Sequence, residues 1–232
     1  MKRLMALLLA ALLIPACAPA EVPDTKTDGE AAYAAGDTVL FGVYEQDNDT
    51  ANGPEPIEWI VLEALEDRLL LISRYALDTQ PYNGQRSTAK WEQCTLRAWL
   101  NGEFLTAAFG EAEQSAILTT AVDSGRLQGI GGFPGSGANR TEDRIFLLNR
   151  AEAWEYFRDD ASRQCSPTAY AAARDANRDG EGNCWWWLCT PGAVPYSAAA
   201  VYMNGTECSY DVNRVGGAVR PALWMEIVSG TF

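Results

Sequence analysis

Three consecutive tryptophans, Trp185 to Trp187, constrain the fold of this chain more than any other feature. Successive side chains of an extended strand point to opposite faces, so Trp185 and Trp187 would share one face and Trp186 would take the other. Three exposed indoles would form an apolar patch that soluble monomers rarely show. We therefore expect this run to fill a core, and only its most exposed indole would be free to stack on a ligand.

Strand-like patterns lie on both sides of a helical middle. Apolar runs bounded by Asp, Asn, Gly or Pro predict strands over residues 38–44, 57–62, 68–73, 143–149, 185–188, 198–203, 209–214 and 219–227. Helical spacing predicts short helices over residues 104–109, 111–118, 151–157 and 167–173. This order indicates one α+β domain over residues 37–232.

One longer helix is predicted between these strands. Ser87 or Thr88 can cap its start, and Asn101-Gly102 supplies a stop signal. Its apolar face would carry the side chains of Trp91, Leu96, Trp99 and Leu100.

The first sixteen residues have the shape of an export signal. A short basic start (Lys2, Arg3) precedes an apolar run over residues 4–14, and a small residue stands before Cys17. The run is much shorter than the roughly 20 apolar residues that a membrane-spanning helix needs. We therefore expect residues 1–16 to be a signal peptide.

Cys17 is the candidate lipidation site. Residues 14–17, Ile-Pro-Ala-Cys, resemble the lipobox of bacterial lipoproteins, in which the cysteine is acylated and becomes the new N-terminus. Ordinary cleavage near residues 18–20, which would release a secreted protein, stays open. Residues 17–36 lack hydrophobic periodicity and are expected to be the lipidated cysteine and a flexible tether. The predicted location is the bacterial cell surface, through a lipid anchor.

The net charge excludes several partners. Loss of residues 1–16 removes two of the 18 basic residues, so 16 basic residues face 31 acidic ones and the net charge becomes −15. A nucleic-acid-binding protein needs a basic face, and the chain has no basic cluster. Anionic lipid headgroups would repel the domain, so we expect the acyl chain alone to hold it at a membrane.

Histidine is absent, which excludes many catalytic and metal sites. Without it the chain has no Ser-His-Asp or Cys-His arrangement and no histidine-ligated zinc or iron. The glycine-rich segment over residues 129–140 lacks the Lys-Ser/Thr of a P-loop and is expected to be a surface loop.

The remaining cysteines form an odd set of five: Cys94, Cys165, Cys184, Cys189 and Cys208. At least one thiol should therefore stay free if no intermolecular bridge forms, and Cys94 is expected to be that buried thiol. If the segment between Cys184 and Cys189 is extended, these residues lie roughly 16 Å apart, too far for a direct bridge. Bridges from them to Cys165 or Cys208 are favoured instead.

Residues 175–180, Asp-Ala-Asn-Arg-Asp-Gly, match the opening of an EF-hand calcium loop. Asp175, Asn177 and Asp179 would supply oxygen ligands, but Trp186 stands at the twelfth position, where a glutamate is expected. A surface turn rich in Asx residues is the favoured interpretation, and a calcium site is the alternative.

Seven segments follow one another in a familiar order: IEWIVLE, LLLISRYALDTQPYN, WEQCTLRAWLNGEF, DRIFLLNRAEAWEYF, SPTAYA, WWWLCTPG and AVRPALWM. Together they resemble the domain-of-unknown-function family 6273 over roughly residues 37–228. That resemblance implies an exported or membrane-attached protein of anaerobic bacteria, and it implies no activity. Relatives usually carry arginine where this chain has Cys189.

The last two of these segments, WWWLCTPG and AVRPALWM, are also similar to the C-type-lectin-like and formylglycine-generating-enzyme-like fold. This similarity implies a compact α+β domain whose loops carry the function. The enzymes of that fold use a cysteine pair at the spacing of Cys184 and Cys189 to hold copper, and two thiolates suit Cu(I). A copper-dependent thiol oxidase built on these cysteines is therefore the alternative function.

The favoured function is a binding module, with a glycan, a peptide or a neighbouring surface protein as its ligand. Trp185, Trp187 and Arg220 are the candidate contacts, together with the polar loops over residues 129–140 and 174–183. No cofactor is expected for this function, calcium at residues 175–180 is the alternative, and catalysis is not favoured.

Overall fold

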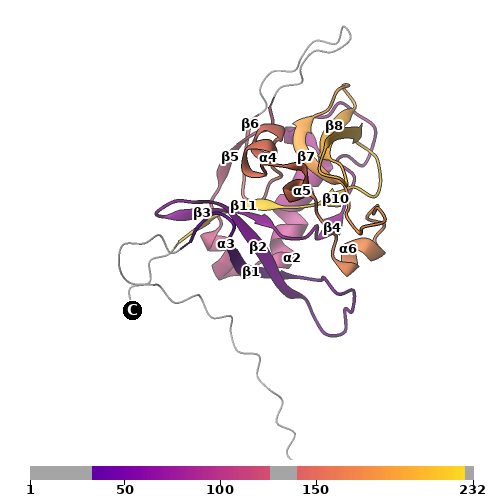
Figure 1. Cartoon of the computed structure of the whole chain (residues 1–232). Coiled ribbons are helices and arrows are strands. Elements are labelled where there is room, and N and C mark those ends of the chain that lie inside the picture. Colours follow the sequence, from indigo (N-terminus) through magenta and orange to yellow (C-terminus); the bar gives the residue numbers. More distant parts are fainter. Residues whose placement is uncertain (1–32, 126–139, 228–232) are drawn as a thin grey trace, which may run out of the picture.

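The computed structural model describes residues 33–125 and 140–227, and it shows curled antiparallel sheets with a few short helices (Figure 1). The α+β class is confirmed at this level. Cys17, the signal segment and residues 129–139 lie outside the described residues. No helix within the described ranges has the length and apolar character to cross a membrane.

The first sheet has four strands in the order β1-β2-β3-β11. Its members are β1 (Thr38–Tyr44), β2 (Glu55–Ala64), β3 (Arg68–Ser73) and β11 (Ala222–Glu226). Every neighbouring pair is antiparallel. The predictions for the first three strands are confirmed, and the last strand of the chain closes the edge beside β3.

The second sheet has five strands in the order β4-β10-β7-β8-β9. Its members are β4 (Asp78–Thr79), β10 (Ala218–Val219), β7 (Trp186–Pro191), β8 (Ser197–Val201) and β9 (Glu207–Asp211). The predicted strand over residues 219–227 is divided at Arg220-Pro221, because the chain leaves the second sheet there and enters the first. A separate hairpin pairs β5 (Thr120–Asp123) with β6 (Arg140–Asp143).

The helices are short. They are η1 (Trp91–Gln93), α1 (Thr95–Trp99), η2 (Leu100–Phe104), α2 (Leu105–Ala108), α3 (Glu111–Ala116), α4 (Arg150–Tyr156), α5 (Asp160–Arg163) and α6 (Ala169–Ala173). In Figure 1, α2 and α3 lie beside β1 and β2. The predicted helices over residues 104–109, 111–118, 151–157 and 167–173 are confirmed, with small differences at their ends.

The predicted start and end of the longer helix were wrong. Residues 91–93 form a single 3₁₀ turn, and the helix begins after Cys94, whose sulfur accepts a hydrogen bond from the Arg97 amide at 3.3 Å. It continues through Asn101-Gly102 as one turn of π-helix, η2. The Asn101 side chain donates to the carbonyls of Arg97 and Ile145, at 3.1 and 2.8 Å, which holds this residue inside the helix.

The strand predicted over residues 143–149 was also wrong. Strand β6 ends at Asp143, where the predicted strand would begin, and it pairs with β5. Beyond it, Phe146 makes only a single bridge, to Ala222. The Asn101 Oδ1 atom accepts hydrogen bonds from the amides of Arg144 and Ile145. A side chain therefore takes the place of a strand partner at this point.

The three tryptophans lie in the core, as their spacing predicts. Trp185, Trp186 and Trp187 have exposed fractions of 1%, 0% and 0%. Trp185 and Trp187 contact each other edge to face, with ring centroids 4.8 Å apart, whereas Trp186 packs against Phe157. All six residues of β7 are buried, so this strand is covered on both faces.

Candidate functional site

A cavity of about 240 Å³ lies where four distant segments meet, and we call it the Asp78 pocket. Its walls come from the end of β1, from β4, from the α1–η2 turn and from α6. At about 30 Å³ for each water molecule, it would hold about eight waters, the space of one small ring-shaped group. The lining residues are Tyr44, Asp78, Gln80, Trp99, Glu103, Phe104, Ala107, Tyr170 and Arg174.

Asp78 forms the polar floor of the pocket. Its side chain is almost fully buried, and its exposed fraction is 2%. The carboxylate accepts hydrogen bonds from the Tyr44 hydroxyl at 2.6 Å, the Arg174 Nε atom at 2.8 Å and the Thr79 amide at 2.6 Å. These three donors compensate the buried negative charge.

Tyr44 acts as a donor in this network. Burial raises the pKa of its hydroxyl, and the negative charge of Asp78 and the hydrogen bond to it raise the pKa further. The phenol therefore stays protonated at neutral pH. Arg174 also lies over the Tyr170 ring, with its guanidinium carbon 5.2 Å from the ring centroid.

Aromatic rings form the walls. The Tyr44 ring lies 5.1 Å from Phe104 and 5.9 Å from Tyr170, and Trp99 lies 5.3 Å from Phe104, measured between centroids. Trp99, Tyr44 and Tyr170 are partly exposed, so each ring offers apolar surface at the pocket.

The π-helical turn brings Trp99 and Phe104 together. These residues are five positions apart, and the i→i+5 pattern of a π-helix places such positions one above the other. In a regular α-helix, with 3.6 residues per turn, they would point in clearly different directions. The aromatic wall therefore depends on this turn, and π-helical turns occur frequently at functional sites.

Trp185, Trp187 and Arg220, the contacts predicted from the sequence, lie elsewhere and are core residues. The two indoles are sealed, as described above, and leave no ring face for a ligand. Arg220 has an exposed fraction of 2% and lies between Phe157 and Trp186, with its guanidinium carbon 4.9 and 5.2 Å from the ring centroids. Packing against neighbouring elements buries all three.

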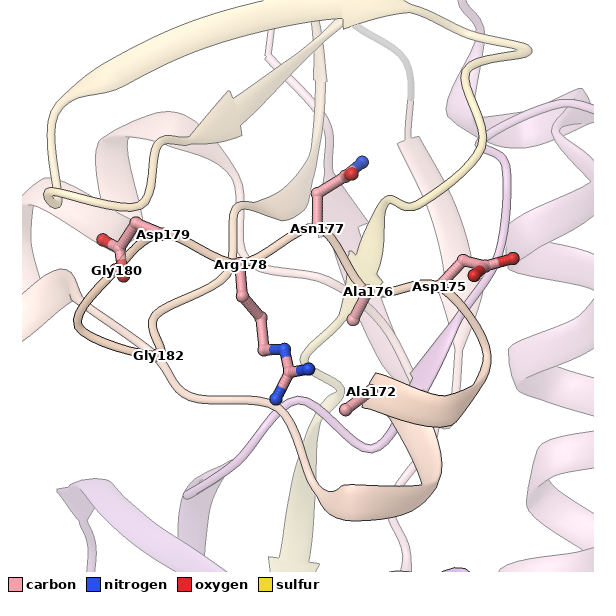
Figure 2. A pocket seen from close by; sticks show the side chains of 8 residues that line it. All are labelled: Ala172, Asp175, Ala176, Asn177, Arg178, Asp179, Gly180 and Gly182. Atoms are coloured by element: carbon pink, nitrogen blue, oxygen red, sulfur yellow. The ribbon is translucent and has the colours of Figure 1, made fainter.

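Asp175, Asn177 and Asp179 line a shallow, open pocket of about 540 Å³ (Figure 2). The structure does not bring their oxygens together, because Asp175 and Asp179 stand at opposite ends of the loop. Asp179 accepts hydrogen bonds from the amides of Glu181 and Asn183, both at 2.9 Å, and so stabilises its own turn. This geometry is that of a surface turn.

A different acidic cluster lies in the β1–β2 loop, where the sequence analysis had no candidate. The carboxylate oxygens of Glu45, Asp47 and Glu55 lie within 4.8 Å of one another. Asp47 already accepts hydrogen bonds from Asn52 and from the Asp49 amide. Within the described residues, this is the one set of three metal-ligating groups so close together.

The two cysteines of the copper alternative have different neighbours. The Cys184 sulfur donates to the Cys165 carbonyl at 3.3 Å. Cys189 lies beside Cys94, and its carbonyl accepts from the Tyr82 hydroxyl at 3.0 Å. The five cysteines of the described ranges are all free thiols.

Of the residues that line the Asp78 pocket, only Arg174 falls within a segment predicted from the sequence to bind, the loop over residues 174–183. A signal was nevertheless present, because three of the seven quoted segments meet there. LLLISRYALDTQPYN carries Asp78, WEQCTLRAWLNGEF carries Trp99 and Phe104, and SPTAYA carries Tyr170. Their convergence could not be inferred without the fold.

Comparison with known proteins gives one match. No curated protein and no solved structure matches this chain. The sequence model described as Domain of unknown function (DUF6273) matches residues 66–227, a range that contains every lining residue of the pocket except Tyr44. Because the match covers well over half of the chain, this protein belongs to the DUF6273 family.

Proposed function

We propose that this protein is a lipid-anchored bacterial surface protein whose domain binds one saccharide unit in the Asp78 pocket. The observation that carries this proposal is the combination of partly exposed aromatic walls with a buried, hydrogen-bonded carboxylate floor. A saccharide ring has apolar C–H faces and a rim of hydroxyl groups, so it needs both kinds of surface.

The walls and the floor suit different parts of such a ligand. Trp99 and Tyr170 offer ring faces for stacking. Asp78 and Glu103 can accept hydrogen bonds from hydroxyl groups, and Arg174 can donate them. The protein supplies three of the roughly four hydrogen bonds that the Asp78 carboxylate can accept, which leaves one position for a ligand hydroxyl.

The remaining parts of the proposal concern location and fold. Attachment through acylated Cys17 would keep the acidic domain at the membrane despite its repulsion from anionic headgroups. We assign the domain to the C-type-lectin-like folds, on the pattern of its final segments and on the placement of β11 beside β3. Radiolabelled palmitate would label the wild-type chain, and Cys17→Ser would abolish this label.

A binding experiment tests the pocket. The chain would be screened on a glycan array, and the Kd of each bound saccharide would be measured by calorimetry. Trp99→Ala removes one aromatic wall and should weaken binding roughly 10-fold, the upper end of what an aromatic contact contributes. Trp224→Ala is the matched control, because Trp224 is also partly exposed but lies on β11, under Arg68.

The control should bind as the wild type does. Equal affinities of wild type and Trp99→Ala, with both variants folded by circular dichroism, would contradict the proposed site. An array without a bound saccharide, combined with capture of peptides in a peptide array, would favour the peptide alternative.

A further inference from the structure

Two buried thiols contact each other at the base of the tryptophan run. Cys165 lies between α5 and α6, and Cys184 stands two residues before β7. The Cys184 amide donates to the Cys165 carbonyl at 2.8 Å, and the Cys184 sulfur donates to the same carbonyl at 3.3 Å. The Cys165 sulfur in turn lies within hydrogen-bond distance of the Arg74 and Ser166 carbonyls, at 3.7 and 3.5 Å.

This geometry suits a disulfide bond. A disulfide requires Cα atoms about 4.4–6.8 Å apart, and residues joined by a direct amide-to-carbonyl hydrogen bond are held near this range. The Cys184 sulfur lies 3.3 Å from the Cys165 carbonyl oxygen, so the two side chains start from the same small volume of the core.

The positive charge of Arg220 acts on both sulfurs and favours the ionised form of each. Its guanidinium group is buried, and its Nε atom donates to the Ser73 carbonyl at 2.9 Å. Its Nη1 atom has no hydrogen-bond partner within residues 33–125 and 140–227. A buried cation with an unpaired N–H group favours an anion beside it, and the adjacent sulfurs are the groups able to become one.

The two thiols are not equivalent. The hydrogen bond from Cys184 and the charge of Arg220 lower the pKa of Cys165. The pKa of Cys184 is raised, because its proton is shared with Cys165 and because the group is buried. In the folded protein Cys165 is therefore the more acidic of the two thiols.

We propose that Cys165 and Cys184 form a disulfide bond in the exported protein, by thiol–disulfide exchange with a disulfide oxidant outside the cytoplasm. The thiolate of one of the two cysteines attacks one sulfur of the oxidant, forms a mixed disulfide and releases the other sulfur as a thiolate, which takes up the proton of the second cysteine. The thiolate of the second cysteine then attacks the sulfur of the first and releases the second oxidant sulfur, which takes up the proton that the first cysteine gave to solvent. Two protein thiols are oxidised, and one oxidant disulfide is reduced to two thiols.

The exchange takes place during folding, before β7 closes over the pair, because both side chains are sealed afterwards. The proposal rests on export, the location assigned above, but not on the Asp78 pocket. Cys94, Cys189 and Cys208 remain thiols in the oxidised protein.

The test is oxidative refolding of the full chain. Reduced, unfolded protein would be refolded in a buffer of oxidised and reduced glutathione with a metal chelator, alkylated and mapped by mass spectrometry. We expect a cross-linked peptide pair that joins Cys165 to Cys184, and alkylated Cys94, Cys189 and Cys208. The oxidised form should melt about 6 to 12 °C above the reduced form, because the bond restricts the unfolded chain.

Cys184→Ser should abolish the cross-link and the rise in melting temperature, whereas the matched control Cys208→Ser should retain both. The map of the wild-type protein decides the proposal even if a variant does not fold. Full alkylation of Cys165 and Cys184 after oxidative refolding, or a bond from Cys184 to Cys189 or Cys208, would overturn it. Saccharide binding is measured separately, so its failure would leave this result intact.

Discussion

At the scale of single residues, several buried groups stay neutral because their charged forms would lose hydration. Cys94, Cys189 and Tyr82 lie together, and burial is the largest cause of the raised pKa of each. For Cys94 burial raises the pKa to about 12. Each group keeps its proton in the folded state at alkaline pH values where the unfolded chain loses it. The free energy of unfolding therefore depends on pH in the alkaline range.

Stability should therefore fall as pH rises from about 9 to about 12. In this window the unfolded chain loses the Cys94 proton, since a free thiol has a pKa of about 8.5, while the folded chain keeps it. The folded state binds more protons, so one such group lowers the free energy of unfolding by up to about 1.4 kcal/mol per pH unit. Urea unfolding from pH 8 to 11, in the presence of a reductant, measures this slope.

Cys94→Ser separates the ionisation of the Cys94 thiol from its role as the N-cap of α1. A serine hydroxyl can still cap α1 by accepting from the Arg97 amide, but it does not ionise in this range. The variant should show a shallower decline of stability with pH. Parallel pH dependences of the two proteins would show that Cys94 is ionised or exposed in the fold.

At the scale of elements, an irregularity in β1 makes room for the end of α2. The pairing register of β1 with β2 shifts between Leu40 and Val43. Gly42 lies in this shift with a φ of 69°, a conformation that residues with a side chain rarely adopt. A Cβ atom there would lie 2.5 Å from the Phe109 ring and 2.7 Å from the Ala108 carbonyl oxygen. Both the backbone and the packing therefore require glycine.

Gly42→Ala should destabilise the protein by about 2 to 5 kcal/mol, the sum of a left-handed backbone and an overpacked contact. Gly53→Ala is the matched control, because Gly53 has a φ of 88° but no atom within 4 Å of the added Cβ. It should cost only about 1 to 2 kcal/mol. Denaturant unfolding gives both values. Equal losses would mean that the contact with Phe109 and Ala108 relaxes without cost.

At the scale of the whole molecule, the two larger sheets share one core. The same cluster of buried residues includes Leu71 of the first sheet and Trp187 of the second. The chain passes from the second sheet to the first at Arg220-Pro221, and Arg220 itself donates to Ser73 at the end of β3. We infer that neither sheet can lose its packing alone.

Thermal unfolding should therefore be a single transition. Far-ultraviolet circular dichroism and tryptophan fluorescence should give the same melting temperature. Leu71→Ala, a fully buried position in β3, should cost about 3 to 5 kcal/mol. It should lower the melting temperature measured by either signal by the same amount, although β3 itself carries no tryptophan. Two separate transitions would show that the sheets unfold independently.

Local rules explain which predictions from the sequence were confirmed. Apolar runs bounded by polar turn residues located β1 and β3, and the bulk of three indoles required a buried β7. Predictions failed where a distant side chain replaced a local partner. The Asn101 side chain keeps the chain helical beyond the predicted stop at Asn101-Gly102. It also accepts the backbone hydrogen bonds that a strand partner would have accepted near residues 144 and 145.

The sequence by itself determined the α+β class, the core role of the tryptophans and membership of the DUF6273 family, because these depend on residue types and their spacing. Only the tertiary structure decided that Asp78 meets Tyr44 and Arg174, and that Cys184 meets Cys165. The physical reason is that spacing determines which face of an element a side chain takes, whereas the pairing of distant strands and helices determines what covers that face.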